Sequence, residues 1–250
     1  MTERSSTAPA TSSAELAVTV VIPVHNEGPN IRATLEALYA AVDEPITVYI
    51  VYDRDEDDTL PVVRDLQARM TGLELLQNRL GAGALNAIRS GLAAAQRGVV
   101  VVMMADQSDD PGTLPAMIAA ARGGSMVVAA SRYSRGGRQI GGPWLKGTLS
   151  RLAGLSLHLL AGVPTLDPTN SYKAYRSELL DAVRIESDGG FEVGIELVVK
   201  AHRMGMRIAE VPTVSRADRP AGASRFRLWK WLPKYGRWYW YALAGRRTEA

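Results

Sequence analysis

The sequence has no cysteine and no long uninterrupted apolar run. The absence of cysteine among 250 residues excludes disulfides and thiolate metal sites, so any metal would need oxygen or imidazole ligands. No stretch reaches the roughly 18 uncharged apolar residues of a membrane-spanning helix. Residues 1–15 are rich in Ser, Thr, Ala and Pro without an apolar core, which predicts a disordered tail rather than a signal peptide. If the protein works at a membrane, we expect it to lie on the surface.

Histidine is scarce, whereas charge is abundant and unevenly distributed. The three histidines, His25, His158 and His202, fall in no Ser/His/Asp arrangement, so a nucleophilic triad is not indicated. Residues 1–126 hold 9 Lys/Arg against 16 Asp/Glu, but residues 127–176 hold 7 against 1. The acidic first half indicates a cation site and the basic second half an anionic partner, with ordinary solvated surface charge as the alternative.

Short β-like runs alternate with helical patterns through most of the chain. This alternation predicts an α/β fold, a Rossmann-like and mostly parallel sheet with helices on both faces. Ligands of such sheets bind outside the carboxyl ends of the strands. We expect one domain over residues 16–227 and a C-terminal amphipathic, aromatic and basic segment over 228–250. The expected strands are 16–24, 46–52, 73–76, 99–104, 126–130 and 207–214, and the expected helices are 31–42, 59–70, 83–95, 114–122, 144–162 and 191–204.

An apolar run ends in a cluster of acids at residues 99–110, VVVVMMADQSDD. The apolar part predicts a strand buried on both sides, which would deliver Asp106 to the ligand crevice. Mg²⁺ takes oxygen ligands and often uses one or two carboxylates plus substrate phosphates, so Asp106 is the predicted metal ligand. Asp109 and Asp110 are predicted mainly as turn and cap residues, with Pro111 at the start of the next helix.

Two further motifs follow expected strands. In YDRDEDDT, residues 52–59, Asp53 can accept hydrogen bonds from a base or a ribose, and the later acids are predicted as turn formers and first-turn residues. In RLGAGALNAIRSG, residues 79–91, Gly81 and Gly83 precede a helix. This loop lacks the third glycine of a dinucleotide fingerprint and the lysine of a P-loop. A nucleotide-contacting loop and a plain turn both stay open for it.

Basic residues gather in two places in the second half of the chain. Arginine forks suit phosphate, so the first group predicts a phosphate site, with a solvated loop as the alternative; it comprises Arg132, Arg135, Arg138, Lys146 and Arg151. The second group lies at the C-terminal end, where tryptophans and tyrosines alternate with Lys and Arg. Such a mixture is typical of a membrane-interface segment. Stacking on single-stranded nucleic acid and covering of the domain core are the alternatives.

Several stretches, taken in order, resemble the family 2 inverting glycosyltransferases. VTVVIPVHNE resembles the opening strand of that family, and YDRDEDDT and MADQSDDP fall where the family carries V-D-D-x-S-x-D-G-T and D-A-D-L-x-x-P-P. The later blocks resemble the polyprenol-phosphate (dolichol-phosphate) mannosyltransferase branch; they are ASRYSRGG, LDPTNSYKAYR, GFEVGIELVVKAHRMG, IAEVPTV and DRPAGASRF. The resemblance covers residues 17–228.

The resemblance implies a GT-A fold and a metal-dependent hexosyltransferase. The donor would be a nucleotide diphospho-sugar of the GDP-mannose or UDP-glucose type, bound with Mg²⁺ or Mn²⁺. The acceptor would be a polyprenyl phosphate, reached by a peripheral protein at the cytoplasmic face of the membrane. In that family the metal and nearby cations stabilise the leaving diphosphate, and an anionic acceptor needs no strong general base.

The same resemblance assigns roles to individual residues. The nucleotide pocket would be shaped by Pro23, Asn26 and Glu27, with Asp53 at the base or ribose. The metal would be held by Asp106 and Ser108. The acceptor phosphate would be gripped by Arg132, Lys146, Ser150 and Arg225. Met104 departs from the pattern, because it stands where the family usually has the first Asp of D-A-D.

Two alternatives accompany this prediction. The first is a glycosyltransferase of the same fold with a soluble or glycan acceptor, against which the basic aromatic segment argues. The second is a nucleic-acid-binding module, which would leave the acids after the strands unexplained, so we expect no nucleic-acid partner. Because the dolichol enzymes also work with membrane subunits, a membrane-protein partner or a homo-oligomer stays open.

Overall fold

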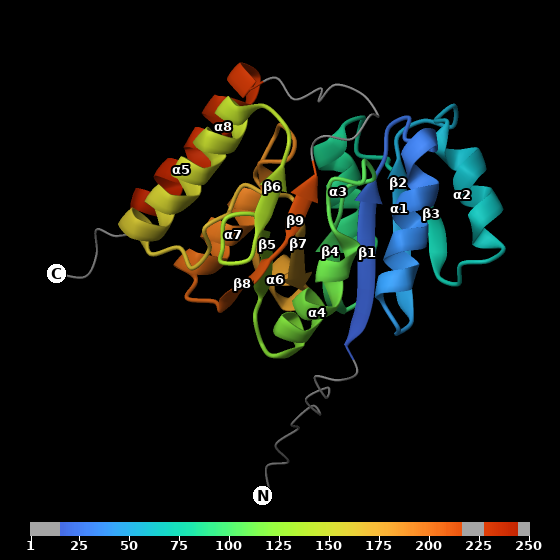
Figure 1. Ribbon diagram of the computed structural model, residues 1–250, viewed down its shortest axis with the longest axis horizontal. Coiled ribbons are helices and arrows are strands. Elements are labelled where there is room, and N and C mark those ends of the chain that lie inside the picture. Colours follow the sequence, from blue (N-terminus) through green and yellow to red (C-terminus); the bar gives the residue numbers. More distant parts are fainter. Residues whose placement is uncertain (1–15, 217–227, 245–250) are drawn as a thin grey trace, which may run out of the picture.

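The protein is built on a seven-stranded sheet with helices on both faces (Figure 1). The computed structural model describes residues 16–216 and 228–244. The strand order is β3-β2-β1-β4-β7-β5-β8, and β6 and β9 pair in a separate two-stranded sheet. The strands are β1 (Ala17–Pro23), β2 (Ile46–Tyr52), β3 (Leu73–Gln77), β4 (Gly98–Val102), β5 (Val127–Ser131), β6 (Arg138–Ile140), β7 (Lys173–Arg176), β8 (Ile208–Pro212) and β9 (Val214–Arg216).

Apart from α6 and α8, the helices fall close to the segments expected from the sequence; α6 was not expected, and α8 lies in the segment predicted only as amphipathic, aromatic and basic. They are α1 (Gly28–Ala41), α2 (Thr59–Gln67), α3 (Ala84–Ala94), α4 (Leu114–Arg122), α5 (Trp144–Ala161), α6 (Ser177–Ala182), α7 (Val193–Arg203) and α8 (Leu228–Ala244). A short 3-10 helix, Pro111–Thr113, precedes α4. The α/β class and the mostly parallel sheet are therefore confirmed.

The strand directions follow the predicted pattern with one exception. β1 pairs in parallel with β2 and β4, β2 with β3, and β5 with β8. β7 runs antiparallel between β4 and β5. Neither β7 nor β6 was expected, because strands of four and three residues are too short to show an alternating pattern. The expected strand over 99–104 ends early, at Val102.

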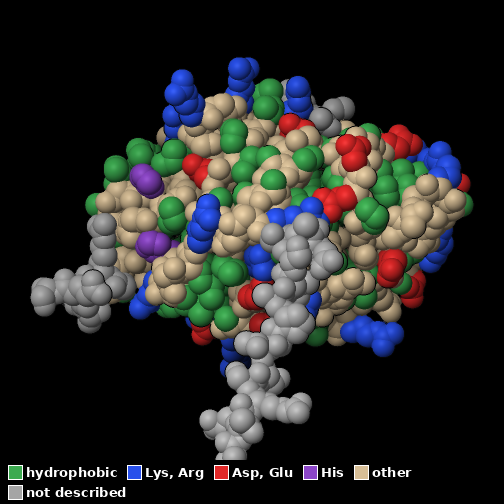
Figure 2. Space-filling view, turned by 90° about the horizontal axis from the view of Figure 1, so that it is seen from below, with side chains coloured by type: hydrophobic (Ala, Val, Ile, Leu, Met, Phe, Trp, Pro, Cys, Tyr) green, Lys and Arg blue, Asp and Glu red, His purple; other side chains and the backbone are tan. Residues whose placement is uncertain are grey.

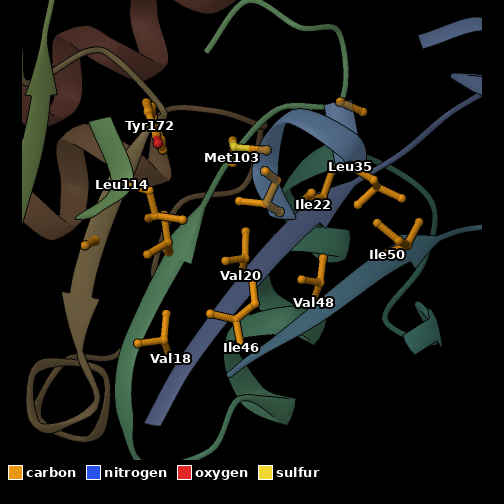
Figure 3. Close-up of a cluster of buried hydrophobic side chains, with 14 of the residues drawn as sticks. Val18, Val20, Ile22, Leu35, Ile46, Val48, Ile50, Met103, Leu114 and Tyr172 are labelled. Carbon is orange, nitrogen blue, oxygen red and sulfur yellow. The ribbon is translucent and has the colours of Figure 1, made fainter. Parts of the chain in front are cut away.

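Alternating residues of the central strands fill two cores, one on each face of the sheet. On the first face, side chains of β1 and β2 pack against Leu35 of α1 (Figure 3); they include Val18, Val20, Ile22, Ile46, Val48 and Ile50. On the other face, Val21 and Val100 meet residues of α3 and α7. Burial of each large aliphatic side chain contributes about 1.5–3 kcal/mol, so these strands fix the scaffold under the site.

The C-terminal helix α8 lies along α5 and α7 (Figure 1). Trp238 is only 1% exposed, and its Nε1 donates to Ser187 Oγ at 3.1 Å. Tyr239 donates its hydroxyl to Ser156 of α5 at 2.9 Å. Trp238 thus covers the core, whereas Trp240 is 68% exposed. Among the described helices, none is both long and apolar enough to cross a bilayer.

Candidate active site

The loops after β1 and β4 meet where the strand order reverses. The chain lays β2 and β3 on one side of β1, and β4 returns to the other side, which creates the crevice where open α/β sheets bind ligands. Among the described residues, the two non-glycine positions with positive φ lie in these loops, Asn26 at 57° and Gln107 at 60°. Such backbone strain is concentrated at functional sites, so both loops are candidates for ligand contact.

The acidic stretch after β2 braces the loop that follows Pro23 at the end of β1. Its side chains accept hydrogen bonds from three successive backbone N–H groups of that loop. These bonds fix the loop although the backbone of Asn26 has a positive φ. The pairs are Asn26 with Asp57 (3.1 Å), Glu27 with Thr59 (2.9 Å) and Gly28 with Asp58 (2.9 Å). Asp57 also accepts from Thr59 N at 2.9 Å. The prediction of simple turn and first-turn acids missed this bracing role, because it depends on residues about thirty positions away.

Asp53 and the glycine loop come together at the end of β2. The two oxygens of Asp53 accept from Asn78 Nδ2 at 2.7 Å and from Gly83 N at 2.8 Å. Asn78 also donates to the carbonyl of Gly81 at 2.7 Å, and both glycines have positive φ. Because a carboxylate oxygen accepts more than one hydrogen bond, Asp53 can hold this loop and a ligand hydroxyl or amine together. Its nucleotide role stays a prediction.

The loop after β4 separates the three acids that the sequence placed together. Asp106 Oδ1 accepts from Ser108 N at 3.0 Å, which orients its carboxylate. Asp110 accepts from Gly112 N at 3.0 Å and caps the 3-10 helix, as predicted. Asp109 does not act as a cap. It is buried and accepts from Met104 N at 2.9 Å, which ends β4 and explains the early end of that strand.

Buried charge lies beneath the loop. Burial raises the pKa of Asp109 to about 7, an effect that the Met104 N–H opposes and the Asp106 charge adds to. Lys173 of β7 is fully buried and donates to the carbonyl of Asn170. Burial lowers the pKa of Lys173 to about 7, although the Asp167 carboxylate favours its charged form. Opposite charges thus partly compensate one another beneath the crevice.

The donor set around Asp106 suits a divalent cation only in part. Among the described residues, no group of three or more His, Asp or Glu side chains is arranged to hold a metal ion. Asp106 offers one carboxylate beside the Ser108 hydroxyl, and Met104 packs against the second core rather than adding a ligand. This set fits Mg²⁺ or Mn²⁺ that takes its other ligands from a diphosphate and water, and it would not form an all-protein cage.

Arg132 stands after β5 in a network of buried partners. Its Nε and Nη2 donate to the two oxygens of Asp167 at 2.7 and 2.8 Å, and its backbone N donates there at 3.0 Å. Arg132 Nη2 also donates to Ser150 Oγ at 3.0 Å, and Ser150 lies 2.6 Å from Thr169 Oγ1. Burial disfavours the charged guanidinium, but the bonds to Asp167 outweigh it and raise the pKa of Arg132.

Lys146 links this network to the loop after β4. It stands on the first turn of α5, one turn before Ser150. Burial and the positive Arg132 lower the pKa of Lys146, while Asp106 acts to raise it. Lys146 therefore lies within electrostatic reach of both groups. The structure brings Arg132, Lys146 and Ser150 together, as the resemblance implied, and their role at the acceptor phosphate stays a prediction. Arg225 lies outside the described residues.

Sequence reasoning overlooked Asp167 and Lys173. Asp167 is the partner that orients Arg132, and its side chain is completely buried. A signal was present, because Asp167 is the single acidic residue among residues 127–176. An isolated acid within a basic block is a natural partner for one of those cations. Lys173 gave no comparable signal, since nothing local distinguishes it from a surface lysine.

The sequence matches a protein-family model and is similar to known proteins. The family model described as Glycosyl transferase family 2 matches residues 19–184. The undecaprenyl-phosphate mannosyltransferase of Micrococcus luteus is 32% identical over 218 residues, which are 83% of this chain and 86% of that protein. The polyprenol monophosphomannose synthase of Mycolicibacterium smegmatis is 29% identical over 213 residues, 82% of this chain and 79% of that protein.

Solved structures show the same fold. Glucosyl-3-phosphoglycerate synthase from Mycobacterium tuberculosis, in complex with Mn²⁺, UDP-glucose and phosphoglyceric acid, superposes with a TM-score of 0.65 at 21% identity. The match covers 94% of this chain and 81% of that chain. It confirms the GT-A fold that the sequence predicted. The family model and the relative at 32% identity show that the chain belongs to glycosyl transferase family 2.

Proposed function

We propose that this glycosyltransferase moves a hexose, with mannose first among the candidates, from a nucleotide diphospho-sugar to a polyprenyl phosphate. The observation that carries the proposal is the convergence of two groups of opposite charge at one edge of the sheet. Asp106 follows β4, and Lys146 lies within electrostatic reach of both Asp106 and Arg132. Arg132 in turn lies within electrostatic reach of Asp109, in the same loop as Asp106. The relatives named as undecaprenyl-phosphate and polyprenol mannose transferases support the acceptor class.

The donor end of the site would be formed by the loops after β1, β2 and β4. Asn26 and Glu27 would form a braced wall, and Asp53 and the Gly81–Gly83 loop would present hydrogen-bonding groups. Asp106, which is exposed in the loop after β4, would complete this end of the site. Asp106 and Ser108 would hold Mg²⁺ or Mn²⁺, which would neutralise charge on the leaving diphosphate. The complex of the solved relative with Mn²⁺ and UDP-glucose supports this cofactor class.

The acceptor end would be formed by Arg132, Lys146 and Ser150. In the proposed step, an acceptor phosphate oxygen forms a bond to the anomeric carbon. The bond from that carbon to the diphosphate oxygen breaks on the opposite face, which inverts the configuration. The acceptor is already anionic, so this chain needs to position it rather than deprotonate it. Asp167 holds the guanidinium of Arg132 in a fixed direction, which reduces the reorganisation needed when the phosphate binds.

A radiolabel transfer assay tests the proposal. Labelled GDP-mannose and UDP-glucose are offered separately with undecaprenyl phosphate and Mg²⁺ or Mn²⁺, and product is extracted into organic solvent. We expect label in the organic phase with one donor. Transfer only to water-soluble acceptors would overturn the acceptor assignment and favour the alternative of a soluble or glycan acceptor.

Two substitutions in one loop provide a matched pair for the metal assignment. Asp106→Asn removes the predicted ligand and is expected to abolish transfer. Asp110→Asn changes only the cap of the 3-10 helix, and asparagine caps about as well as aspartate, so activity should be retained. Full activity of Asp106→Asn, or transfer unchanged by a chelator, would contradict the metal role.

A further inference from the structure

The outward face of α5 is apolar, which is the reverse of an ordinary surface helix. A helix on a globular protein turns its apolar stripe inward and its polar side chains to water. On α5 the buried residues are Gly154, Leu157 and Ala161, yet large apolar side chains also follow one another along the outer side. They are between 37% and 79% exposed and comprise Trp144, Leu145, Leu149, Leu152, Leu155 and Leu159; we call them the α5 apolar face.

This face is continuous and not a scatter of single residues. Apart from the adjacent Trp144 and Leu145, its members are spaced by three or four positions, which places them on one side of a helix with 3.6 residues per turn. Elsewhere in the described residues, exposed large apolar side chains such as Leu80 and Met204 stand alone. Contiguous exposed apolar surface of this kind marks a contact surface, so α5 presents a surface for a partner.

The same helix carries the predicted acceptor residues. Lys146 and Ser150 stand on the first half of α5, and Ser150 accepts a hydrogen bond from Arg132. Whatever covers the α5 apolar face therefore lies beside the acceptor end of the site. Lys146 and Ser150 lie on the same inward stripe of α5 as the buried Gly154, so a phosphate carried by a lipid would reach them past the N-terminal end of the helix.

Charge on this part of the molecule favours a negatively charged partner. Residues 131–166, which contain α5 and the loop before it, hold five Lys/Arg and no Asp or Glu. Arg151 is exposed on α5 itself. In the view from below, acidic side chains lie mostly in the right half, toward α1 and α2, whereas the left end shows hydrophobic side chains and histidine (Figure 2). A second copy docked through this face would bring like charges together, whereas an anionic lipid surface would be attracted.

We infer that the α5 apolar face docks the protein on an anionic bilayer, with α5 lying in the plane of the interface. The inference rests on the proposed function and specifies how the lipid acceptor is reached. Leucines enter the boundary between headgroups and acyl chains, and Trp144 at the helix start lies at the headgroup level. The membrane contact is thereby placed on α5, beside the C-terminal segment that composition singled out.

Vesicle co-sedimentation of the full chain tests this surface. Vesicles of phosphatidylcholine alone and of phosphatidylcholine with phosphatidylglycerol are compared for wild type and for the double variant Leu152→Gln, Leu159→Gln. We expect wild type to bind the anionic vesicles and the double variant to partition on the order of thirtyfold more weakly, because two leucines no longer leave water. Met204→Gln, which changes an isolated apolar side chain that is 49% exposed at the C-terminal cap of α7, should bind as wild type does.

A second measurement separates this inference from the proposed function. Transfer to a short-chain, water-soluble polyprenyl phosphate in vesicle-free buffer should proceed at the wild-type rate in the double variant, which also shows that it folds. Vesicle binding unaffected by the double substitution would overturn the docking surface while leaving the proposed function intact. Equally, a dimer in analytical ultracentrifugation that the double variant dissociates, without vesicle binding by wild type, would overturn it in favour of a second copy. Vesicle binding through α5 without transfer to any polyprenyl phosphate would support the surface and refute the proposed function.

Discussion

Replacement of Asp167 by Asn should destabilise the protein far more than loss of an ordinary ion pair. The Asp167 side chain is 0% exposed and that of its partner Arg132 is 13% exposed, so the substitution leaves a buried guanidinium without its counter-charge. Breaking a buried pair in this way costs about 3–5 kcal/mol. For a chain of this length, about 2–4 °C of Tm is lost per kcal/mol, which gives a decrease of about 6–20 °C.

The chain offers a matched control in Arg32 and Asp65. This pair has the same chemistry at 2.8 Å but is exposed, with 44% and 63% of the two side chains accessible. Exposed pairs contribute about 1 kcal/mol or less, so Asp65→Asn should lower Tm by a few degrees at most. Differential scanning calorimetry of both variants decides the matter. Equal shifts would refute the view that Asp167 stabilises a desolvated Arg132, and with it the positioning role assigned to Asp167.

Three further changes have defined outcomes. Gly154→Ala would place a Cβ 1.9 Å from the Leu166 carbonyl oxygen and should lower the free energy of unfolding by about 1–3 kcal/mol. In the control, Gly236→Ala, the new Cβ meets nothing within 4 Å, so Tm should rise slightly. A higher Tm for Gly154→Ala would contradict the packing argument. Asp53→Ala removes the acceptor of one Asn78 Nδ2–H, which is part-buried, and of the exposed Gly83 N–H, so it should lower stability by about 1 kcal/mol. It should also weaken binding of the nucleotide sugar in calorimetric titration, and an unchanged affinity would remove Asp53 from the nucleotide site. The pKa of Lys173 is lowered from 10.5 to about 7, so between these pH values the unfolded chain holds a proton that the folded chain has released. The free energy of unfolding should therefore rise with pH over this range, by up to about 1.4 kcal/mol per pH unit. Urea unfolding at several pH values should show that Lys173→Met reduces this rise, and an identical pH profile would refute the assignment.

The positions of most helices and strands could be predicted because their apolar periodicity is local. The site residues that follow strands, such as Asn26, Asp53 and Asp106, could be predicted for a related reason, since parallel strands end at one edge of the sheet. The predictions failed for features that depend on burial or on distant partners. Asp109 looks like a cap beside a proline, and only the fold shows that it is buried against the Met104 N–H.

The pairing that orients Arg132 shows the same limit. Positions 132 and 167 are separated in the chain by β6 and α5. They come together in the fold, in which β7, the strand after Asp167, lies between β4 and β5. The family resemblance grouped Arg132, Lys146 and Ser150, but it did not reveal that Arg132 is bound to the buried carboxylate of Asp167. The role of the C-terminal segment likewise depended on packing, because composition alone does not distinguish the buried Trp238 from the exposed Trp240.

Because β7 runs antiparallel to β5, the segment between them, which carries the proposed acceptor residues, leaves and re-enters the sheet at the same end. β5 and β7 are hydrogen-bonded neighbours, with Val127 opposite Tyr175 and Ala129 opposite Lys173. The chain between them, which contains β6 and α5, therefore leaves the sheet and returns to it at adjacent points. A segment inserted in this manner can be replaced by that of a relative without altering the order of the remaining strands. Under the proposed function, chimeras joined at β5 and β7 would exchange the acceptor residues Arg132, Lys146 and Ser150 while β1 to β4 kept the original donor loops. They would need β9 and α8 from the same relative, because β6 pairs with β9 and α5 packs against α8.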